Sequence, residues 1–137
     1  MLRRTPLRRK AAKVLRRSDT GPRPDTVFTV LARAKNRCEI CGHRMGLDRG
    51  TLNYNLHHRR PRAMGGSRRS DTNSPANLLA LCLDCHSDVE SNRALALENG
   101  WLLPQTATPS KCAVLLYRES VWVYLTDDGR YSDHPEA

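Results

Sequence analysis

Two pairs of closely spaced cysteines, far apart in the chain, most limit how this sequence can fold. Cys38 and Cys41 form one Cys-x-x-Cys pair, Cys82 and Cys85 form another, and the forty residues 42–81 separate them. Each pair turns two thiolates toward one point, so four thiolates can complete the tetrahedral shell of a zinc ion. In an ordinary zinc ribbon the pairs lie about 15 to 20 residues apart. We therefore expect a structural zinc site made of these four cysteines, enclosing a long insert with a role of its own.

Other interpretations of the cysteines explain less of the sequence. A zinc knuckle in a binding protein accounts for the cysteines alone, and disulfides need an oxidising compartment that nothing here indicates. The run from Cys82 to His86 matches a c-type haem attachment pattern, but that attachment requires export and the N-terminus lacks a signal-peptide apolar segment. Cys112 is flanked by apolar residues and is expected to be a small buried hydrophobe. His43 and His134 stand alone and are expected to be ordinary surface or core residues.

The insert and the residues just after it contain polar side chains that suit metal and acid–base chemistry. His57 and His58 are adjacent, Asn77 follows a loop rich in Gly, Pro and Ser, and His86 comes directly after Cys85. Imidazole titrates near neutral pH and binds divalent cations. Neighbouring residues of a strand point to opposite faces, so His57 and His58 are expected to have different roles. Of the two, His58 is assigned as the general base that takes a proton from water.

The hydrophobic pattern predicts an α+β domain. We expect helices at 25–35, with Asp25 as N-cap, and at 83–97, strands at 52–56 and 78–81, a loop at 60–75, and a C-terminal hairpin of strands 111–117 and 121–126. The hairpin is expected to be structural, although its edge could dock another protein.

In their order and spacing these motifs resemble the HNH endonuclease family, in the small zinc-stapled type of phages and actinobacteria, over residues 27–103. The resemblance implies a ββα-metal (His-Me finger) nuclease core: a strand with the histidine pair, a loop with Asn, a second strand, and a helix with the last histidine. It implies that His57 and His86 bind one catalytic divalent cation. Asn77 would tie the loop and so hold the histidine strand in position.

Glu90 lies one helical turn after His86 on the same face, where some relatives carry a histidine. It is either a third, oxygen ligand of the catalytic cation or a structural carboxylate, and the sequence leaves both open. Two imidazoles and one carboxylate leave positions for water and phosphate, which suits Mg²⁺, Mn²⁺ or Ni²⁺.

The positive charge of the chain is concentrated at its N-terminus. The net charge is +9, and residues 1–23 contain nine Arg or Lys against one acid, whereas the rest has 14 basic and 13 acidic residues. A basic arm suits a polyanion, because neutralising phosphates releases counterions. DNA is therefore the expected partner. A mitochondrial transit peptide is a weaker alternative, since the arm has one serine.

A second basic cluster surrounds the predicted loop, with no acid among its members: Arg59, Arg60, Arg62, Arg68 and Arg69. Arginines can fork onto phosphate oxygens, so we expect these residues to bind DNA. No major-groove reading helix is evident, and cleavage is therefore expected to have low sequence specificity.

These features predict three parts: a flexible basic arm at 1–23, a zinc-stapled HNH domain at 24–104 and a C-terminal β-hairpin extension at 105–137. The expected function is metal-dependent hydrolysis of DNA phosphodiesters by a cytoplasmic protein, without a membrane span or a nucleotide cofactor. The resemblance implies a phage-encoded protein that assists DNA packaging beside a terminase, and a restriction or mobile-element nuclease fits equally well. A non-catalytic, zinc-dependent DNA-binding adaptor is the alternative from another class.

Overall fold

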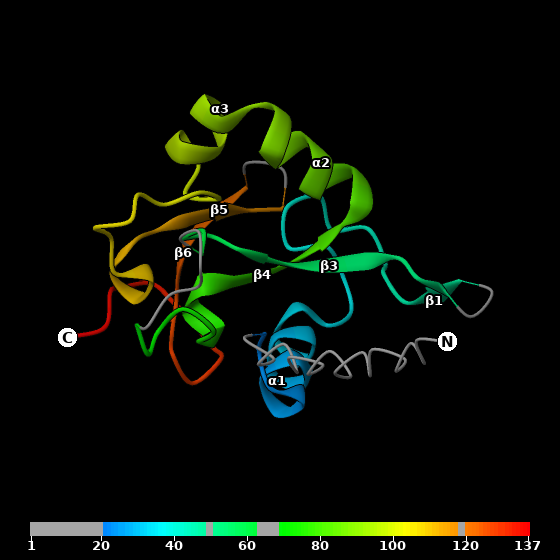
Figure 1. Ribbon diagram of the computed structural model, residues 1–137, viewed down its shortest axis with the longest axis horizontal. Helices are drawn as coiled ribbons and strands as arrows, with labels where there is room; N and C mark the ends of the chain where they lie inside the picture. Colours follow the sequence, from blue (N-terminus) through cyan, green and yellow to red (C-terminus); the bar gives the residue numbers. More distant parts are fainter. Residues whose placement is uncertain (1–20, 49–50, 63–68, 118–119) are drawn as a thin grey trace, which may run out of the picture.

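One buried strand, β4 (Leu78–Cys82), organises the fold (Figure 1). The computed structural model describes residues 21–48, 51–62, 69–117 and 120–137. The first four side chains of β4 are fully buried, as a short apolar run bounded by turn residues predicts. The strand predicted at 78–81 is therefore confirmed.

The partner of β4 is β3 (Tyr54–His58), which carries the histidine pair. The two strands pair antiparallel, with His57 opposite Leu79 and His58 opposite Leu78. The strand predicted at 52–56 began and ended two residues too early, because pairing with β4 extends β3 through both histidines. A short hairpin of β1 (Leu47–Asp48) and β2 (Thr51–Leu52) precedes it.

The helix predicted at 25–35 is confirmed as α1 (Pro24–Ala34), with a different start. Pro24 occupies the first helical turn, where its missing N–H costs nothing. Asp25 lies inside that turn and accepts from the N–H of Thr26, so its predicted N-cap role is wrong. Lys35 ends the helix in the left-handed conformation, with φ of 53°.

The helix predicted at 83–97 is two helices, α2 (Leu83–Ser91) and α3 (Arg93–Glu98). They meet at Asn92, whose φ of −127° and ψ of 74° are not helical. The Asn92 side chain accepts from the N–H of Leu95 at 3.3 Å and so caps α3. Asparagine competes with the helix backbone in this way, and the competition starts a new helix.

The predicted C-terminal hairpin is present as β5 (Val114–Leu116) and β6 (Val121–Leu125), and a third strand, β7 (Tyr131–Ser132), pairs with β6. The first strand starts later than predicted, because a 3₁₀ turn, η2 (Pro109–Lys111), precedes it. A similar turn, η1 (Pro75–Asn77), leads into β4.

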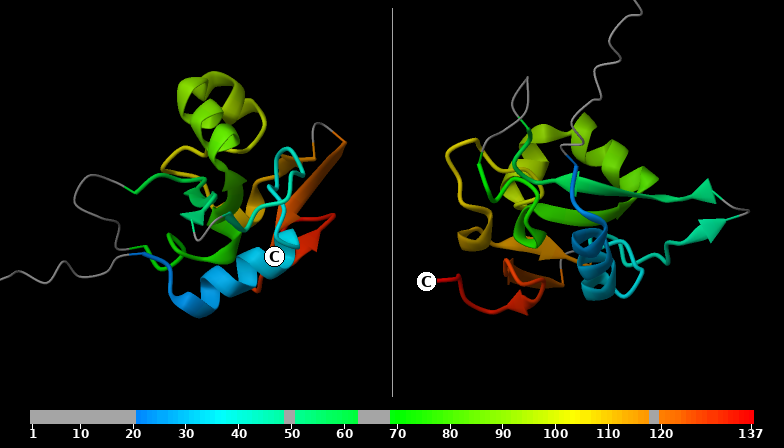
Figure 2. Two further views of the ribbon diagram at one scale, coloured as in Figure 1. Left: turned by 90° about the vertical axis from the view of Figure 1, so that its right-hand side faces the viewer. Right: turned by 60° about the horizontal axis from the view of Figure 1, so that its bottom comes forward.

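A single hydrophobic core joins these elements. It includes Val30 of α1, the side chains of β4, Val89 of α2, and Leu116 and Leu125 of the C-terminal sheet. Figure 2 shows α1 on one side of the β3–β4 pair, α2 and α3 on the other, and the C-terminal sheet alongside. Residues 105–137, predicted as an extension, therefore contribute to the same core as residues 24–104. In the described part of the chain, none of the helices has the length and apolar composition that crossing a bilayer requires.

Candidate functional site

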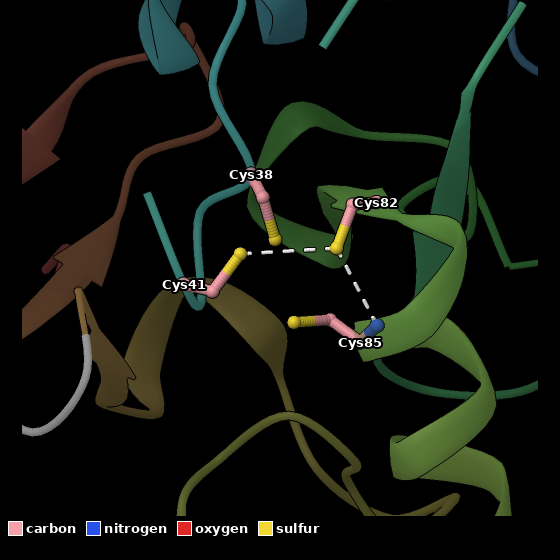
Figure 3. Close-up of side chains that lie close together, drawn as sticks. All are labelled: Cys38, Cys41, Cys82 and Cys85. Atoms are coloured by element: carbon pink, nitrogen blue, oxygen red, sulfur yellow. Dashed lines mark hydrogen bonds between the residues drawn. The ribbon is translucent and has the colours of Figure 1, made fainter. Parts of the chain in front are cut away.

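The four predicted cysteines converge on one point (Figure 3). Cys38 and Cys41 come from the loop after α1, Cys82 ends β4, and Cys85 lies in the first turn of α2. Their sulfur atoms all lie within 4.8 Å of one another, and the Sγ atoms of Cys41 and Cys82 are 3.8 Å apart. Sulfurs at the corners of a tetrahedral zinc site are about 3.8 Å apart. The cluster can therefore hold a structural metal ion such as zinc.

The local backbone explains why the sulfurs meet. The N–H of Cys38 donates to His43 O and the N–H of Gly42 donates to Cys38 O, both at 2.8 Å, which closes the first pair into a tight turn. Cys82 occupies the N-cap position of α2, where its sulfur accepts from the N–H of Cys85. Burial, followed by the proximity of Cys38, raises the pKa of Cys85. The raised pKa means that the Cys85 thiolate is costly to form in the absence of a metal. A bound metal cation would offset that cost, since it favours the thiolate form of every ligand.

His57 is buried on β3, and its surroundings fix its tautomer. The Nε2 atom lies 2.8 Å from the backbone oxygen of Trp101. A carbonyl only accepts, so Nε2 carries the proton and the lone pair of Nδ1 is available to a metal. Metal-binding histidines usually donate their second N–H in this way. Burial lowers the pKa of His57 to about 4, which keeps the ring neutral at pH 7.

His86, on α2, lies next to His57. The centroids of the two rings are 5.5 Å apart, and Nε2 of His86 is 3.3 Å from Oε1 of Glu90. A structural metal site needs several His, Cys, Asp or Glu side chains with their donor atoms close together. Among the described residues, the four cysteines form such a group, with all donor atoms within 4.8 Å of one another. His57, His86 and Glu90 are thus neighbours, but their donor atoms are gathered less tightly than the cysteine sulfurs.

His58, which follows His57 on β3, contacts a different residue. Its Nε2 atom lies 2.8 Å from Oδ1 of Asn73, and burial lowers its pKa. Asn73 was not predicted as a site residue. The signal that could have found it is the one asparagine in the predicted loop 60–75, four residues before Asn77.

One pocket of about 240 Å³ brings the predicted histidines together. Its lining residues are Leu56, His57, His58, Pro61, His86, Glu90, Arg93 and Leu102. The pocket therefore contains the three histidines, one carboxylate and one guanidinium group. Arg93 is a further residue that the sequence analysis missed, because it lies outside the basic cluster around the loop.

Asn77 is fully buried and ties the loop to the end of β3. Its Oδ1 accepts from the N–H of Arg60 at 2.8 Å, and its Nδ2 donates to Arg60 O at 3.2 Å and to Thr72 O at 2.7 Å. Asn77 does not line the pocket. Its contacts are therefore those of a residue that holds β3 in position without reaching the pocket.

The structure corrects the prediction that Arg59 binds DNA. Its side chain has no exposed surface, and its guanidinium donates to five backbone oxygens, those of Ala76, Gly100, Pro109, Cys112 and Ala113. Burial lowers its pKa to about 10, so the group stays charged at pH 7. A buried guanidinium is tolerable because these acceptors satisfy its N–H groups. Arg59 therefore joins the loop and η2 to the core and cannot reach a phosphate.

Arg60 is likewise wrong as a DNA ligand. It is 1% exposed, and its guanidinium pairs with Asp71 at 2.5 Å and donates to Ala107 O at 3.0 Å. Of the other predicted arginines, Arg62 contacts Asn73 at 3.4 Å, and Arg69 is exposed and donates to Gln105 O at 2.7 Å. Arg68 lies outside the described residues.

No protein-family model matches the chain, and no significant match occurs among the curated proteins or the solved structures.

Proposed function

We propose that this protein is a zinc-stapled HNH endonuclease that hydrolyses DNA phosphodiester bonds with a divalent cation. The observation that carries the proposal is the shared lining of one pocket by His57, His58, His86 and Glu90. These residues lie on β3 and α2, and β4 connects the two, an order that suits a ββα-metal arrangement. The fully buried Asn77 supports the same proposal, since it ties the loop to the strand with the histidine pair.

Each side chain has a role that follows from its contacts. His57 offers Nδ1 and His86 a ring nitrogen to a divalent cation, and Glu90 offers a carboxylate oxygen or orients His86. Such a cation, when bound, would polarise the phosphate and stabilise the leaving oxygen. A site with two or three protein ligands leaves room for water and phosphate, which suits Mg²⁺, Mn²⁺ or Ni²⁺.

His58 is the proposed base. The amide oxygen of Asn73 accepts from Nε2–H of His58, so Nδ1 is the atom that takes the proton. The water oxygen bonds to phosphorus, the water proton passes to Nδ1, and the P–O ester bond breaks. The leaving oxygen takes a proton from solvent. A positioned base of this kind contributes about 10² to 10⁴ to the rate.

The basic N-terminal arm, with nine Arg or Lys in residues 1–23, supports DNA as the substrate through non-specific phosphate attraction. Within the function proposed here, a cytoplasmic, phage-encoded role beside a terminase rests on the resemblance alone. A restriction or mobile-element role agrees with the same residues.

Cleavage of supercoiled plasmid tests the proposal. Zinc-loaded native protein should convert the plasmid to nicked or linear forms when Mg²⁺, Mn²⁺ or Ni²⁺ is added, and His58→Ala should not. His134→Ala is the matched control, because the His134 side chain is exposed near the C-terminus, contacts its neighbour Asp133 and does not line the histidine pocket. Plasmid binding without cleavage by the native protein would instead establish the adaptor alternative.

A further inference from the structure

Arg93 is the one arginine or lysine among the described residues that line the histidine pocket. It is the first residue of α3, directly after the break at Asn92. In the basic cluster around the loop, by contrast, Arg59 and Arg60 are buried and committed to the fold. Arg62 of that loop contacts Asn73, the partner of His58, but does not line the pocket. Among the described residues that line the pocket, the positive side chain therefore comes from α3.

The contacts of Arg93 give it no structural role. Its side chain is exposed, and across the described residues it forms no hydrogen bond or ion pair. The nearby carboxylate of Glu90 pairs with His86 instead. A cation at the start of a helix also opposes the helix dipole, so α3 gains no stability from it. The pocket consequently contains a guanidinium whose five N–H donors are available to a ligand.

The charges in the pocket fit a phosphodiester. A divalent cation held by His57 and His86 would contribute +2, Glu90 contributes −1 and Arg93 contributes +1, so the loaded pocket would have an excess of positive charge. Guanidinium matches two phosphate oxygens with two parallel hydrogen bonds, a geometry that lysine cannot reproduce. We propose that Arg93, which lines the pocket together with the histidines, binds the non-bridging oxygens of the scissile phosphate. This inference rests on the proposed nuclease function and names the group that holds its substrate.

Substitution of Arg93 tests the inference in the plasmid assay. Arg93→Gln should lower kcat/KM for cleavage by about 100- to 1,000-fold, by analogy with the loss of one donor to a developing anion. Arg93→Lys should recover part of that loss, since it restores the charge without the fork. The matched control is Arg44→Gln, because Arg44 is exposed and lies beside the cysteine turn, away from the pocket. Zinc content and Tm should be unchanged in all three, because both arginines are exposed.

The outcomes separate this inference from the proposed function. If native protein cuts and Arg93→Gln cuts at the native rate, Arg93 does not touch the phosphate and the nuclease proposal stands. An equal loss in Arg93→Gln and Arg44→Gln would mean that general positive charge, and not this position, is responsible. If native protein cuts with none of the metals, the proposed function fails and takes this inference with it.

Discussion

The Nε2 atom of His58 lies 2.8 Å from the Oδ1 atom of Asn73, in a contact that joins β3 to the loop before β4. An amide oxygen only accepts, so the contact fixes the tautomer and the ring orientation of His58. The partner that orients the candidate base is therefore fifteen residues away in sequence, in the loop that Asn77 ties down.

Loss of this contact should slow the reaction without weakening the fold. We expect Asn73→Ala to lower the rate of plasmid cleavage by about 10- to 100-fold, the usual cost of removing a partner that orients an active-site histidine. Zinc content and Tm should stay close to native. Asn55→Ala on β3 is a suitable control, because Asn55 does not line the pocket. Native cleavage by Asn73→Ala would show that the contact has no part in catalysis.

The cysteine cluster predicts which thiols hold zinc. Cys85→Ser should lose the bound zinc and unfold the domain at ordinary temperatures, because metal binding contributes folding free energy. The matched control is Cys112→Ser, since Cys112 lies outside the cluster. Zinc content by atomic absorption and the thermal unfolding curve check both variants. Equal zinc content in native protein and Cys85→Ser would refute the site.

Arg59 should matter for stability and not for DNA affinity. Arg59→Gln leaves several buried carbonyl oxygens without a donor, and each such loss costs about 1–3 kcal/mol. Urea unfolding should therefore give a free energy of unfolding at least about 3 kcal/mol below native. Arg69→Gln, at an exposed position, should change it by less than about 1 kcal/mol. A stable Arg59→Gln protein with reduced DNA affinity would restore the original prediction of a phosphate contact.

The pair of Arg60 and Asp71 predicts a pH-dependent part of the stability. The hydrogen bond from Arg60 lowers the pKa of Asp71, so the folded state binds its proton less readily than the unfolded state. The contribution is complete above the unfolded pKa of about 4 and is lost as pH falls through the lower folded value. Asp71→Asn should be about 1–2 kcal/mol less stable than native at pH 6, because Asp71 is partly exposed.

The difference in free energy of unfolding between native protein and Asp71→Asn should shrink below pH 4. Urea unfolding of both at matched zinc concentration, from pH 6 to pH 3, measures it, since zinc release at low pH affects both alike. A difference that stays constant or grows as the pH falls would contradict this assignment.

The sequence was sufficient to predict features of the fold that depend on a local signal. The spacing of the cysteines predicts their cluster, and the apolar run at 78–81 predicts a buried strand. The proximity of His57 and His86 was expected from the resemblance to the HNH family, and their rings do lie next to each other. Within the described residues these features depend on neighbours a few positions away or on a ligand geometry that admits few alternatives.

Other features depend on contacts between distant segments. The burial of Arg59 requires acceptors from residues 76 to 113, and a run of arginines gives no sign of it. The contact of Asn73 with His58 depends on how the loop folds back over β3. The pocket position of Arg93 depends on the break at Asn92, where a local side-chain hydrogen bond overrides a continuous helical pattern.

The most direct test of the nuclease proposal is the metal dependence of plasmid cleavage by zinc-loaded native protein and by His57→Ala. We expect native protein to cut only after Mg²⁺, Mn²⁺ or Ni²⁺ is added, and His57→Ala to keep its zinc and its DNA binding but to lose at least about 100-fold in rate. Cleavage by His57→Ala at the native rate and with the same metal requirement would contradict the proposal, as would a native protein that cuts with none of these ions.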